Sequence, residues 1–462
     1  MTTLLFFDDW PLHFRRNMIR RMGVPQWVPE ATLEDDIVEG TWNFPFVYRD
    51  LDTGIWRGLY SGVSYKSSDD GKTRQFLGLL VAESPDGIYW TKPDVSNRSL
   101  VEHRRRPNQV FSFHDKSSDG APVFYDPVET DPSRRLKYLF QSGNQEWIAA
   151  SGDGIVWKLD DRPWDHRKLD APITCFYNYH QKCYTIVNRP WTGDRRTALI
   201  ETKDFRTLSE PRVVIHPDPL DPPMIQFYGM PTYPYEGMYV GLLQCLHTDP
   251  NEGGYHKRWG YVDGALTYSY DGRDFNRTLR EPFVPRTQRG EQGSGGIYPS
   301  TLLVDPDNRI RIYSGGARWA HFQSTEGPDA ALLLHTLRLD GFMYLESDAG
   351  TGYIMTRRLR FSGPKLSLNV RAPYGLVRTQ ISEIDGTPIA GFTFNECVPF
   401  RGDDLFYEPR WTSGLTPAAL GSRYVHLEVE LTHGDIYAVR GDMEMVVAIR
   451  DDIVPIKKLS QE

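Results

Sequence analysis

Ser84-Pro-Asp-Gly-Ile-Tyr-Trp90 and Ser151-Gly-Asp-Gly-Ile-Val-Trp157 are two copies of one pattern, in which a hydroxyl residue is followed by Asp, Gly and an aromatic residue. Two further copies are Thr202-Lys-Asp-Phe-Arg-Thr-Leu208 and Ser269-Tyr-Asp-Gly-Arg-Asp-Phe275, and Leu339-Asp-Gly-Phe342 is a weaker one. The aspartates at positions 86, 153, 204, 271 and 340 are separated by 67, 51, 67 and 69 residues. Such near-regular spacing is typical of a chain built from structural repeats.

Each phrase predicts a tight turn at a hairpin joint, because Asp caps its own backbone and Gly adopts a positive φ. Strand-like apolar runs precede the turns, such as Phe76–Ala82 and Gly264–Tyr268. A period of about 50 to 70 residues that holds about four short strands is typical of a β-propeller blade. Five copies therefore predict five blades.

The innermost strand of each predicted blade is an apolar or aromatic run that is followed by a turn. The five candidates are Asn43–Tyr48, Ala121–Tyr125, Pro172–Tyr177, Phe227–Tyr233 and Ile297–Leu303. A ring of blades needs a closing strand, and we expect the N-terminal run Leu4–Phe7 to complete the sheet of the last blade.

The pattern changes after about Ser347. Evenly spaced segments with period-2 alternation follow, among them Lys365–Val370, Leu376–Ile381 and Tyr424–Leu431, and Asp385-Gly386 is typical of a hairpin turn. The sequence thus predicts an all-β protein with a five-bladed β-propeller over residues 1–347 and a C-terminal β-sandwich over residues 348–462. We expect the sandwich to pack against the propeller or to mediate the formation of a homo-oligomer.

Composition limits the classes of partner. The 462 residues carry a formal net charge of −8, which argues against binding to nucleic acid or to an anionic membrane. The start of the chain shows no basic region followed by a long apolar one, and nowhere do about 18 apolar residues run together. We therefore expect a cytoplasmic protein.

The four cysteines, at positions 175, 183, 245 and 397, form no C-x-x-C pair and no metal-ligand spacing. Cys175 and Cys183 lie far enough apart in sequence to face each other across a hairpin. Buried free thiols are the preferred interpretation for a chain without an export signal. No cofactor or metal ion is required by any motif in the sequence.

Carboxylates recur near the start of the innermost strands, where a propeller forms a funnel. These candidate catalytic residues are Glu39, Asp119, Asp170 and Glu291. Carboxylates gathered in one funnel repel one another, so one pKa should rise while another carboxylate stays ionised. Glycoside cleavage needs this division, because an acid protonates the leaving oxygen while a carboxylate acts as nucleophile or base. Asp before Gly is also common in ordinary turns. The catalytic interpretation therefore depends on the recurrence of a carboxylate at equivalent positions in successive blades, and not on any single residue.

The repeats, together with Asp119-Gly-Ala-Pro-Val-Phe-Tyr-Asp126-Pro and the trailing sandwich, resemble the five-bladed propeller glycosidases of glycoside hydrolase families 32, 43 and 68. The phrases Ala82–Gly87 and Leu337–Phe342 are most similar to uncharacterised bacterial proteins that resemble family 32. The resemblance implies that acids from the first three blades act as nucleophile or base, as transition-state stabiliser or pKa modulator, and as general acid. The matching positions are Glu39, Asp119 and Asp170.

The chain also departs from these families. It has no W-M-N-D-P-N-G box and no R-D-P triplet, and its Glu-Cys dipeptide, Glu396-Cys397, lies in the predicted sandwich. The substrates of invertases therefore do not transfer directly to this chain.

Aromatic, basic and amide side chains near the strand ends are candidates for binding sugar rings and hydroxyls. They are Trp42, Asn43, His114, Arg189, Tyr228 and Arg318. The sequence predicts a glycoside hydrolase for an oligosaccharide or glycoside, with a furanoside such as a fructoside or arabinoside as the expected substrate and with glycosyl transfer as a related reaction. Two alternatives stay open. One is a glycoside phosphorylase, for which Arg189, Arg195 or Arg318 would supply a phosphate pocket, and the other is a non-catalytic carbohydrate-binding propeller.

Overall fold

The computed structural model describes residues 1–34, 44–66, 73–102, 104–113, 123–142, 145–166, 169–190, 195–248, 260–321, 331–348 and 350–446. At 63–66, 73–77 and 170–172 it describes the backbone alone. These residues are nearly all in strands and turns, as predicted, and the helical elements among them are three short 3-10 helices: η1 (Pro29–Ala31), η2 (Pro132–Arg134) and η3 (Pro417–Leu420). The chain divides into one compact unit of residues 24–337 and a second of residues 1–23 and 338–462.

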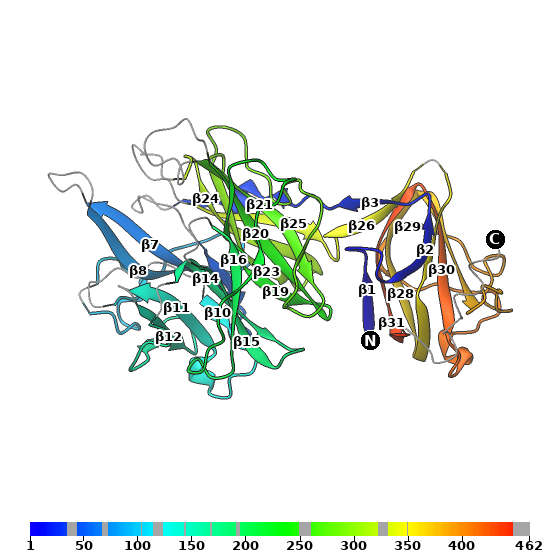
Figure 1. Ribbon diagram of the computed structural model, residues 1–462, viewed down its shortest axis with the longest axis horizontal. Helices are drawn as coiled ribbons and strands as arrows, with labels where there is room; N and C mark the ends of the chain where they lie inside the picture. The colour runs from blue at the N-terminus through cyan, green and yellow to red at the C-terminus, as the bar shows by residue number, and fades with distance from the viewer. Residues whose placement is uncertain are drawn as a thin grey trace. The chain divides into compact units, whose positions relative to one another are not determined.

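Three four-stranded antiparallel sheets make up the first part of the unit of residues 24–337 (Figure 1). Group I contains β6 (Phe46–Arg49), β7 (Trp56–Lys66), β8 (Thr73–Ser84) and β9 (Gln109–Phe111). Group II contains β10 (Val123–Tyr125), β11 (Leu136–Ser142), β12 (Gln145–Ser151) and β13 (Trp157–Leu159). Group III contains β14 (Asp170–Asn178), β15 (Cys183–Arg189), β16 (Thr197–Thr202) and β17 (Arg212–Ile215).

The remaining strands of this unit form a ten-stranded sheet. Its first half, group IV, contains β18 (Ile225–Gly229), β19 (Thr232–Tyr235), β20 (Met238–Thr248), β21 (Gly260–Ser269) and β22 (Asn276–Arg277). Its second half, group V, contains β23 (Gly296–Val304), β24 (Arg309–Ala317), β25 (Ala331–Arg338), β4 (Gln26–Trp27) and β5 (Leu33–Glu34). The halves are joined by the parallel pairing of Val262 with Gly296.

The closing strand differs from the prediction. Residues 26–27 and 33–34 pair with β25 and so complete group V, whereas Leu4 and Leu5 belong to β1 (Thr2–Leu5), which pairs with β31 (Gly434–Val446) of the other unit. Both segments are short and carry apolar residues, and β4 and β5 have only two residues each. Local pattern therefore could not distinguish the strand that closes group V from β1.

Apolar clusters lie between successive strand groups. One cluster joins group I to group II, the next two join group II to group III and group III to group IV, and a smaller one around Tyr228 and Tyr298 joins group IV to group V. A further cluster contains Trp56 and Tyr60 of group I together with Tyr313 and Leu332 of group V. Burial of apolar surface thus links the five groups in a closed cycle.

The repeated phrases form the same turn in groups I to IV, as predicted. In the first copy, Asp86 Oδ1 accepts hydrogen bonds from the backbone N–H groups of Ile88 (2.8 Å) and Tyr89 (3.0 Å). The Ser84 hydroxyl oxygen accepts from the N–H of Gly87, whose φ is +77°. The copies at Asp153, Asp204 and Asp271 repeat this pattern. In the third copy Phe205 replaces Gly and still adopts a positive φ of 53°.

These turns also contact the neighbouring strand group. The Tyr48 hydroxyl of group I donates to the carbonyl of Asp153 in group II (3.0 Å), and Asn178 Nδ2 of group III donates to the carbonyl of Asp271 in group IV (2.8 Å). In group V, Arg311 and Tyr313 donate to the carbonyls of Asp86 and Gly87 in group I. The repeated turn therefore connects two strands of its own group and also contacts the neighbouring group.

The unit of residues 1–23 and 338–462 is built on one nine-stranded sheet. Besides β1 and β31, its strands are β2 (Leu12–Arg16), β3 (Ile19–Met22), β26 (Met343–Ser347), β27 (Gly352–Thr356), β28 (Arg358–Glu383), β29 (Phe400–Tyr407) and β30 (Val425–Thr432). The first half of β28 pairs with β31 and its second half pairs with β30. The predicted boundary between 347 and 348 thus differs from the observed division, which assigns residues 1–23 and 338–347 to this unit.

The cysteine prediction is confirmed, since Cys175, Cys183, Cys245 and Cys397 are all buried and unpaired. Burial raises the pKa of the Cys175 thiol well above its ordinary value. Such a thiol is a poor nucleophile at neutral pH.

Candidate functional site

Half of the predicted site residues lie outside the described part of the chain. They are Glu39, Trp42, Asn43, His114 and Asp119. Asp170 is described by its backbone alone, as the first residue of β14. The described part of the site is therefore built from groups III, IV and V.

Arg189 is the residue that the fold places beside Asp170. It ends β15, and its backbone pairs with that of Asp170 at the start of the group III sheet. Its side chain is 4% exposed, and its guanidinium carbon lies 4.3 Å from the centre of the Tyr228 ring. Two residues predicted independently as substrate contacts, Arg189 and Tyr228, thus stack on each other.

Tyr228 is the centre of an aromatic cluster that joins groups IV and V and also includes Phe44, two residues before β6. Its ring centre lies 6.2 Å from that of Phe44, 5.7 Å from that of Tyr298 and 4.8 Å from that of His321. The Tyr298 hydroxyl and His321 Nδ1 are 3.0 Å apart, within hydrogen-bond distance. Tyr298 is the third residue of β23, and His321 follows β24 and bridges to Gly260.

Arg195 brings a second guanidinium to the same ring. Its guanidinium carbon lies 5.7 Å from the Tyr228 ring centre, and Nη1 donates to Oε1 of Gln226 (2.7 Å). Two of the three arginines proposed for a phosphate pocket therefore meet at Tyr228. Arg318 has an ion-pair partner elsewhere, since its Nη2 donates to Oε1 of Glu34 on β5 (3.2 Å).

The described acid Glu291 has a local role. It lies in the turn before β23, and its Oε2 accepts a hydrogen bond from the backbone N–H of Gln288 (3.0 Å). Its carbonyl accepts from the N–H of Ser294. The carboxylate of Glu291 therefore stabilises its own turn, which is the structural alternative that the sequence left open for each acid.

A His-Asp pair that sequence reasoning missed lies at the end of β20. His247 Nε2 is 3.0 Å from Asp263 Oδ2, and the His247 ring stacks on Tyr261 with ring centres 4.4 Å apart. Arg286 covers the same Tyr261 ring, with its guanidinium carbon 3.9 Å from the centre. No motif marks these residues, because the pairing of β20 with β21 brings them together.

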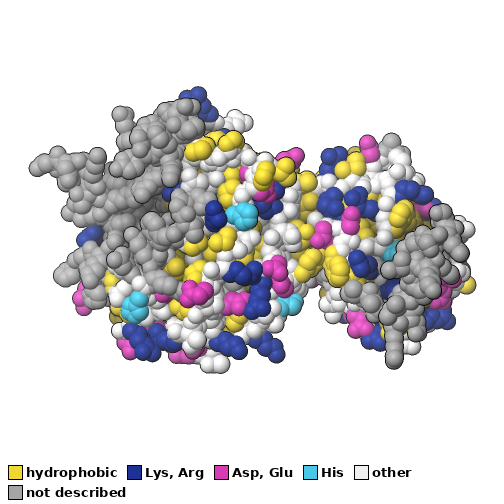
Figure 2. Space-filling model, viewed as in Figure 1, with side chains coloured by type: hydrophobic (Ala, Val, Ile, Leu, Met, Phe, Trp, Pro, Cys, Tyr) yellow, Lys and Arg dark blue, Asp and Glu magenta, His cyan; other side chains and the backbone are white. Residues whose placement is uncertain are grey.

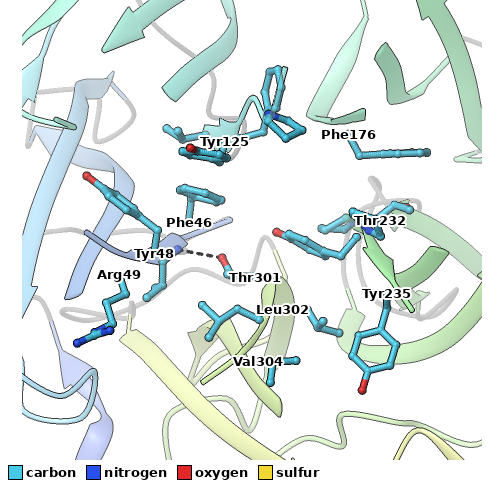
Figure 3. A pocket seen from close by; sticks show the side chains of 18 of the residues that line it. Phe46, Tyr48, Arg49, Tyr125, Phe176, Thr232, Tyr235, Thr301, Leu302 and Val304 are labelled. Carbon is cyan, nitrogen blue, oxygen red and sulfur yellow. Dashed lines mark hydrogen bonds between the residues drawn. The ribbon is translucent and has the colours of Figure 1, made fainter. Parts of the chain in front are cut away.

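A cavity lies further along the innermost strands (Figure 3). It has a volume of about 560 Å³ and is lined by residues of β6, β10, β14, β19 and β23, which come from all five groups, and by Trp56 of β7. Figure 3 shows the hydrogen bond that crosses from group I to group V, from the Val47 N–H to Thr301 Oγ1 (3.0 Å). The described lining of β14 begins at Thr174, four residues after Asp170, and the pairing of β14 with β15 shifts register between these two residues.

Two further properties of the described residues are their surface charge and their metal-ligand groups. Basic and acidic side chains are intermixed on the face shown in Figure 2. Among the described residues, no group of three or more His, Cys, Asp or Glu side chains is placed to hold a metal ion. No helix in the described ranges has the length and apolar character that crossing a membrane requires.

Comparison with known proteins gives structural neighbours and no sequence match. No family model matches the chain, and no curated protein matches it. The similar solved structures include a glycosyl hydrolase from Bacteroides ovatus, with 12% identity over 68% of this chain and 94% of that one and a TM-score of 0.44. They also include the Bombyx mori β-fructofuranosidase of glycoside hydrolase family 32 (11% identity, 88% and 93% coverage, TM-score 0.43). A third is the α-L-arabinofuranosidase of Podospora anserina (11% identity, 68% and 97% coverage, TM-score 0.40).

Proposed function

We propose that this chain is a glycosidase that acts on O-glycosyl bonds, built on a five-bladed propeller with a C-terminal sandwich. The observation that carries the proposal is that one strand from each of the five groups lines a single cavity. Because these five strands surround one cavity, we infer that their first residues are neighbours. In the sequence, the predicted acids lie at or before the first residue of four of these strands.

The spacing of the acids supports a shared location. Asp170 begins β14, and Asp119 precedes the start of β10 at Val123 by four residues. Glu39 precedes the start of β6 at Phe46 by seven residues. We propose that these three acids supply the general acid and the nucleophile or base that glycoside cleavage requires.

The cluster around Tyr228 is the proposed sugar subsite. Aromatic rings present flat apolar faces to sugar rings, and guanidinium groups donate hydrogen bonds to hydroxyls. Arg189, which pairs across the sheet from Asp170, would hold a sugar ring beside that acid. We propose a furanoside such as a fructoside or an arabinoside as the substrate, consistent with the sequence resemblance.

A glycoside phosphorylase is the second candidate function. The observation in its favour is that Arg189 and Arg195 both lie over Tyr228, at 4.3 and 5.7 Å from the ring centre. Two neighbouring guanidinium groups match the geometry and charge of a phosphate ion.

A panel of p-nitrophenyl furanosides and pyranosides, with fructo- and arabino-oligosaccharides, tests both functions when each substrate is assayed with and without phosphate. The glycosidase proposal expects hydrolysis of a furanoside at a rate that phosphate does not change. Turnover that requires phosphate would replace it by the phosphorylase. An absence of turnover, combined with sugar binding on a glycan array, would contradict both and favour a binding protein.

A further inference from the structure

The cavity of Figure 3 has a chemistry that the proposed sugar subsite around Tyr228 does not use. Its volume of about 560 Å³ lies within the range of small-molecule sites. Arg189 and Tyr228 are not among its described lining residues, which begin at Thr174 on β14 and at Thr301 on β23. A ligand in contact with this lining therefore need not occupy the Tyr228 subsite.

Aromatic and aliphatic side chains form most of the cavity wall. Figure 3 shows Phe46, Tyr48, Tyr125, Phe176 and Leu302 around one space. The lining contains rings from four strand groups, since Tyr235 of group IV joins those of groups I to III, and aromatic rings pack well against another flat ring. The wall therefore favours a ligand with an aromatic body.

Large apolar side chains are exposed among the lining residues. Leu51 is 87% exposed, Tyr179 51%, Tyr125 49% and Val304 43%. Scattered apolar residues are ordinary on a protein surface, but a group of them around one cavity indicates a place where an apolar molecule enters.

The charges of the lining set the polarity of the ligand. The negative charge of the Asp305 carboxylate is compensated within the protein. It accepts hydrogen bonds from Arg311 Nε (2.8 Å) and from the backbone N–H groups of Asp307 and Arg309. Arg49, at the edge of the space in Figure 3, has no ion-pair partner among the described residues. The guanidinium of Arg49 is thus the cationic group of the lining that can bind an anionic ligand.

We propose that this cavity binds an aromatic monocarboxylate, with its ring between Phe46, Tyr125 and Leu302 and its carboxylate at Arg49. The aromatic wall selects the body of the ligand, and the guanidinium selects its anionic group. The volume accommodates one such molecule.

Equilibrium titration of the full chain with 2-naphthoate tests this site, with its neutral analogue 2-naphthalenemethanol as the comparison ligand. We expect saturable binding of one naphthoate per chain and at least tenfold weaker binding of the alcohol. Arg49→Gln should weaken naphthoate binding at least tenfold, whereas Arg98→Gln, at an exposed arginine outside the lining, should leave it unchanged.

A second test of the same proposal fills the cavity with a larger side chain. Leu302→Trp should abolish binding, and Val304→Trp, at a position that is already 43% exposed, should weaken it even if the first variant fails to fold. Absence of saturable binding by the wild-type chain would overturn the proposal. Equal binding of the alcohol, or an unchanged affinity in Arg49→Gln, would overturn the assignment of the anionic group. Glycoside turnover is expected to be the same in Arg49→Gln as in wild type.

Discussion

Arg311 Nη1 donates a hydrogen bond of 2.7 Å to the backbone carbonyl of Asp86, a residue 225 positions earlier in the chain. Its Nε is bound to the buried carboxylate of Asp305 at the same time. One side chain therefore connects the hairpin of group V to the repeated turn of group I. Because groups I to IV follow one another in sequence, this contact belongs to the interface that completes the cycle.

Replacement of Arg311 should destabilise the unit of residues 24–337 strongly. Arg311→Met leaves the buried Asp305 carboxylate without its guanidinium, and loss of one partner of a buried pair costs about 3 kcal/mol or more. Urea unfolding monitored by tryptophan fluorescence measures this loss. Arg309→Gln is the control, because Arg309 is 55% exposed at its side chain and should change stability by less than about 1 kcal/mol. Equal stability of the two variants would contradict the role given to Arg311.

The glycine of the first repeated turn should not tolerate a methyl group. Gly87 has a φ of +77°, and a Cβ there would lie 2.6 Å from both Arg311 Nη1 and the Tyr313 hydroxyl. Gly87→Ala thus combines backbone strain with a clash at the joint between groups I and V, and should cost about 2 kcal/mol or more. Gly386→Ala is the matched control, since its φ is +86° but nothing lies within 4 Å of the added Cβ. It should show the strain alone, about 1 kcal/mol. The comparison fails if the two glycines respond alike in thermal unfolding.

The turn aspartates should make the protein sensitive to acid. Backbone N–H groups of Thr207 and Arg206 lower the pKa of the Asp204 carboxyl below its ordinary value. A carboxyl whose folded pKa is lowered contributes stability that is present above its unfolded pKa, near 3.9, and is lost as the pH falls through the folded pKa. Asp204→Asn keeps an acceptor oxygen but cannot titrate. Its free energy of unfolding, measured in urea between pH 6 and pH 3, should fall less steeply than that of wild type, and identical slopes would exclude Asp204 as a contributor.

Substitution of the proposed acids separates catalysis from turn stability. Glu39→Gln, Asp119→Asn and Asp170→Asn should each lower kcat by at least 100-fold on a substrate that the wild type cleaves, because proton transfer and nucleophilic attack need the carboxyl. Glu291→Gln should change kcat by less than about threefold, since the structure gives this carboxylate a local contact in its own turn. Full activity in all three of the first variants would refute the proposed site.

Truncation of Tyr228 should act mainly on substrate binding. Tyr228→Ala removes the ring on which Arg189 and Arg195 stack, and we expect KM to rise at least tenfold, or about 1.4 kcal/mol, with a smaller change in kcat. Tyr125→Ala, which removes an exposed ring of the cavity of Figure 3, is the control and should leave both constants unchanged. A loss confined to kcat would instead place Tyr228 with the reacting groups.

The repeated turns and the hairpins were predictable from the sequence because both depend on local chemistry. A single Asp side chain satisfies two backbone N–H groups within three residues, so the pattern is visible in any copy, including the copy in which Phe205 replaces glycine. The predicted innermost strands also correspond to β6, β10, β14, β18 with β19, and β23.

Contacts between distant segments were not predictable in this way. The pairing of β4 and β5 with β25 and the meeting of His247 with Asp263 depend on register between strands, which no local pattern encodes. The local contact of Glu291 within its own turn was not predictable either, because turn chemistry and catalysis use the same residue type. The recurrence of a carboxylate predicted where acids lie relative to the innermost strands. It could not predict which atoms each carboxylate oxygen contacts.

The pairing of β1 with β31 affects how the chain is made. Thr2 donates from its hydroxyl to the carbonyl of Met443, at a sequence separation of 441 residues. On the ribosome, residues 2–5 emerge long before residues 434–446, and the strand groups of residues 44–337 are synthesised in between. During this interval the backbone groups of β1 have no partner strand, so they can pair with other strands by mistake. Early translation products of this chain are therefore the ones in which a chaperone would matter most.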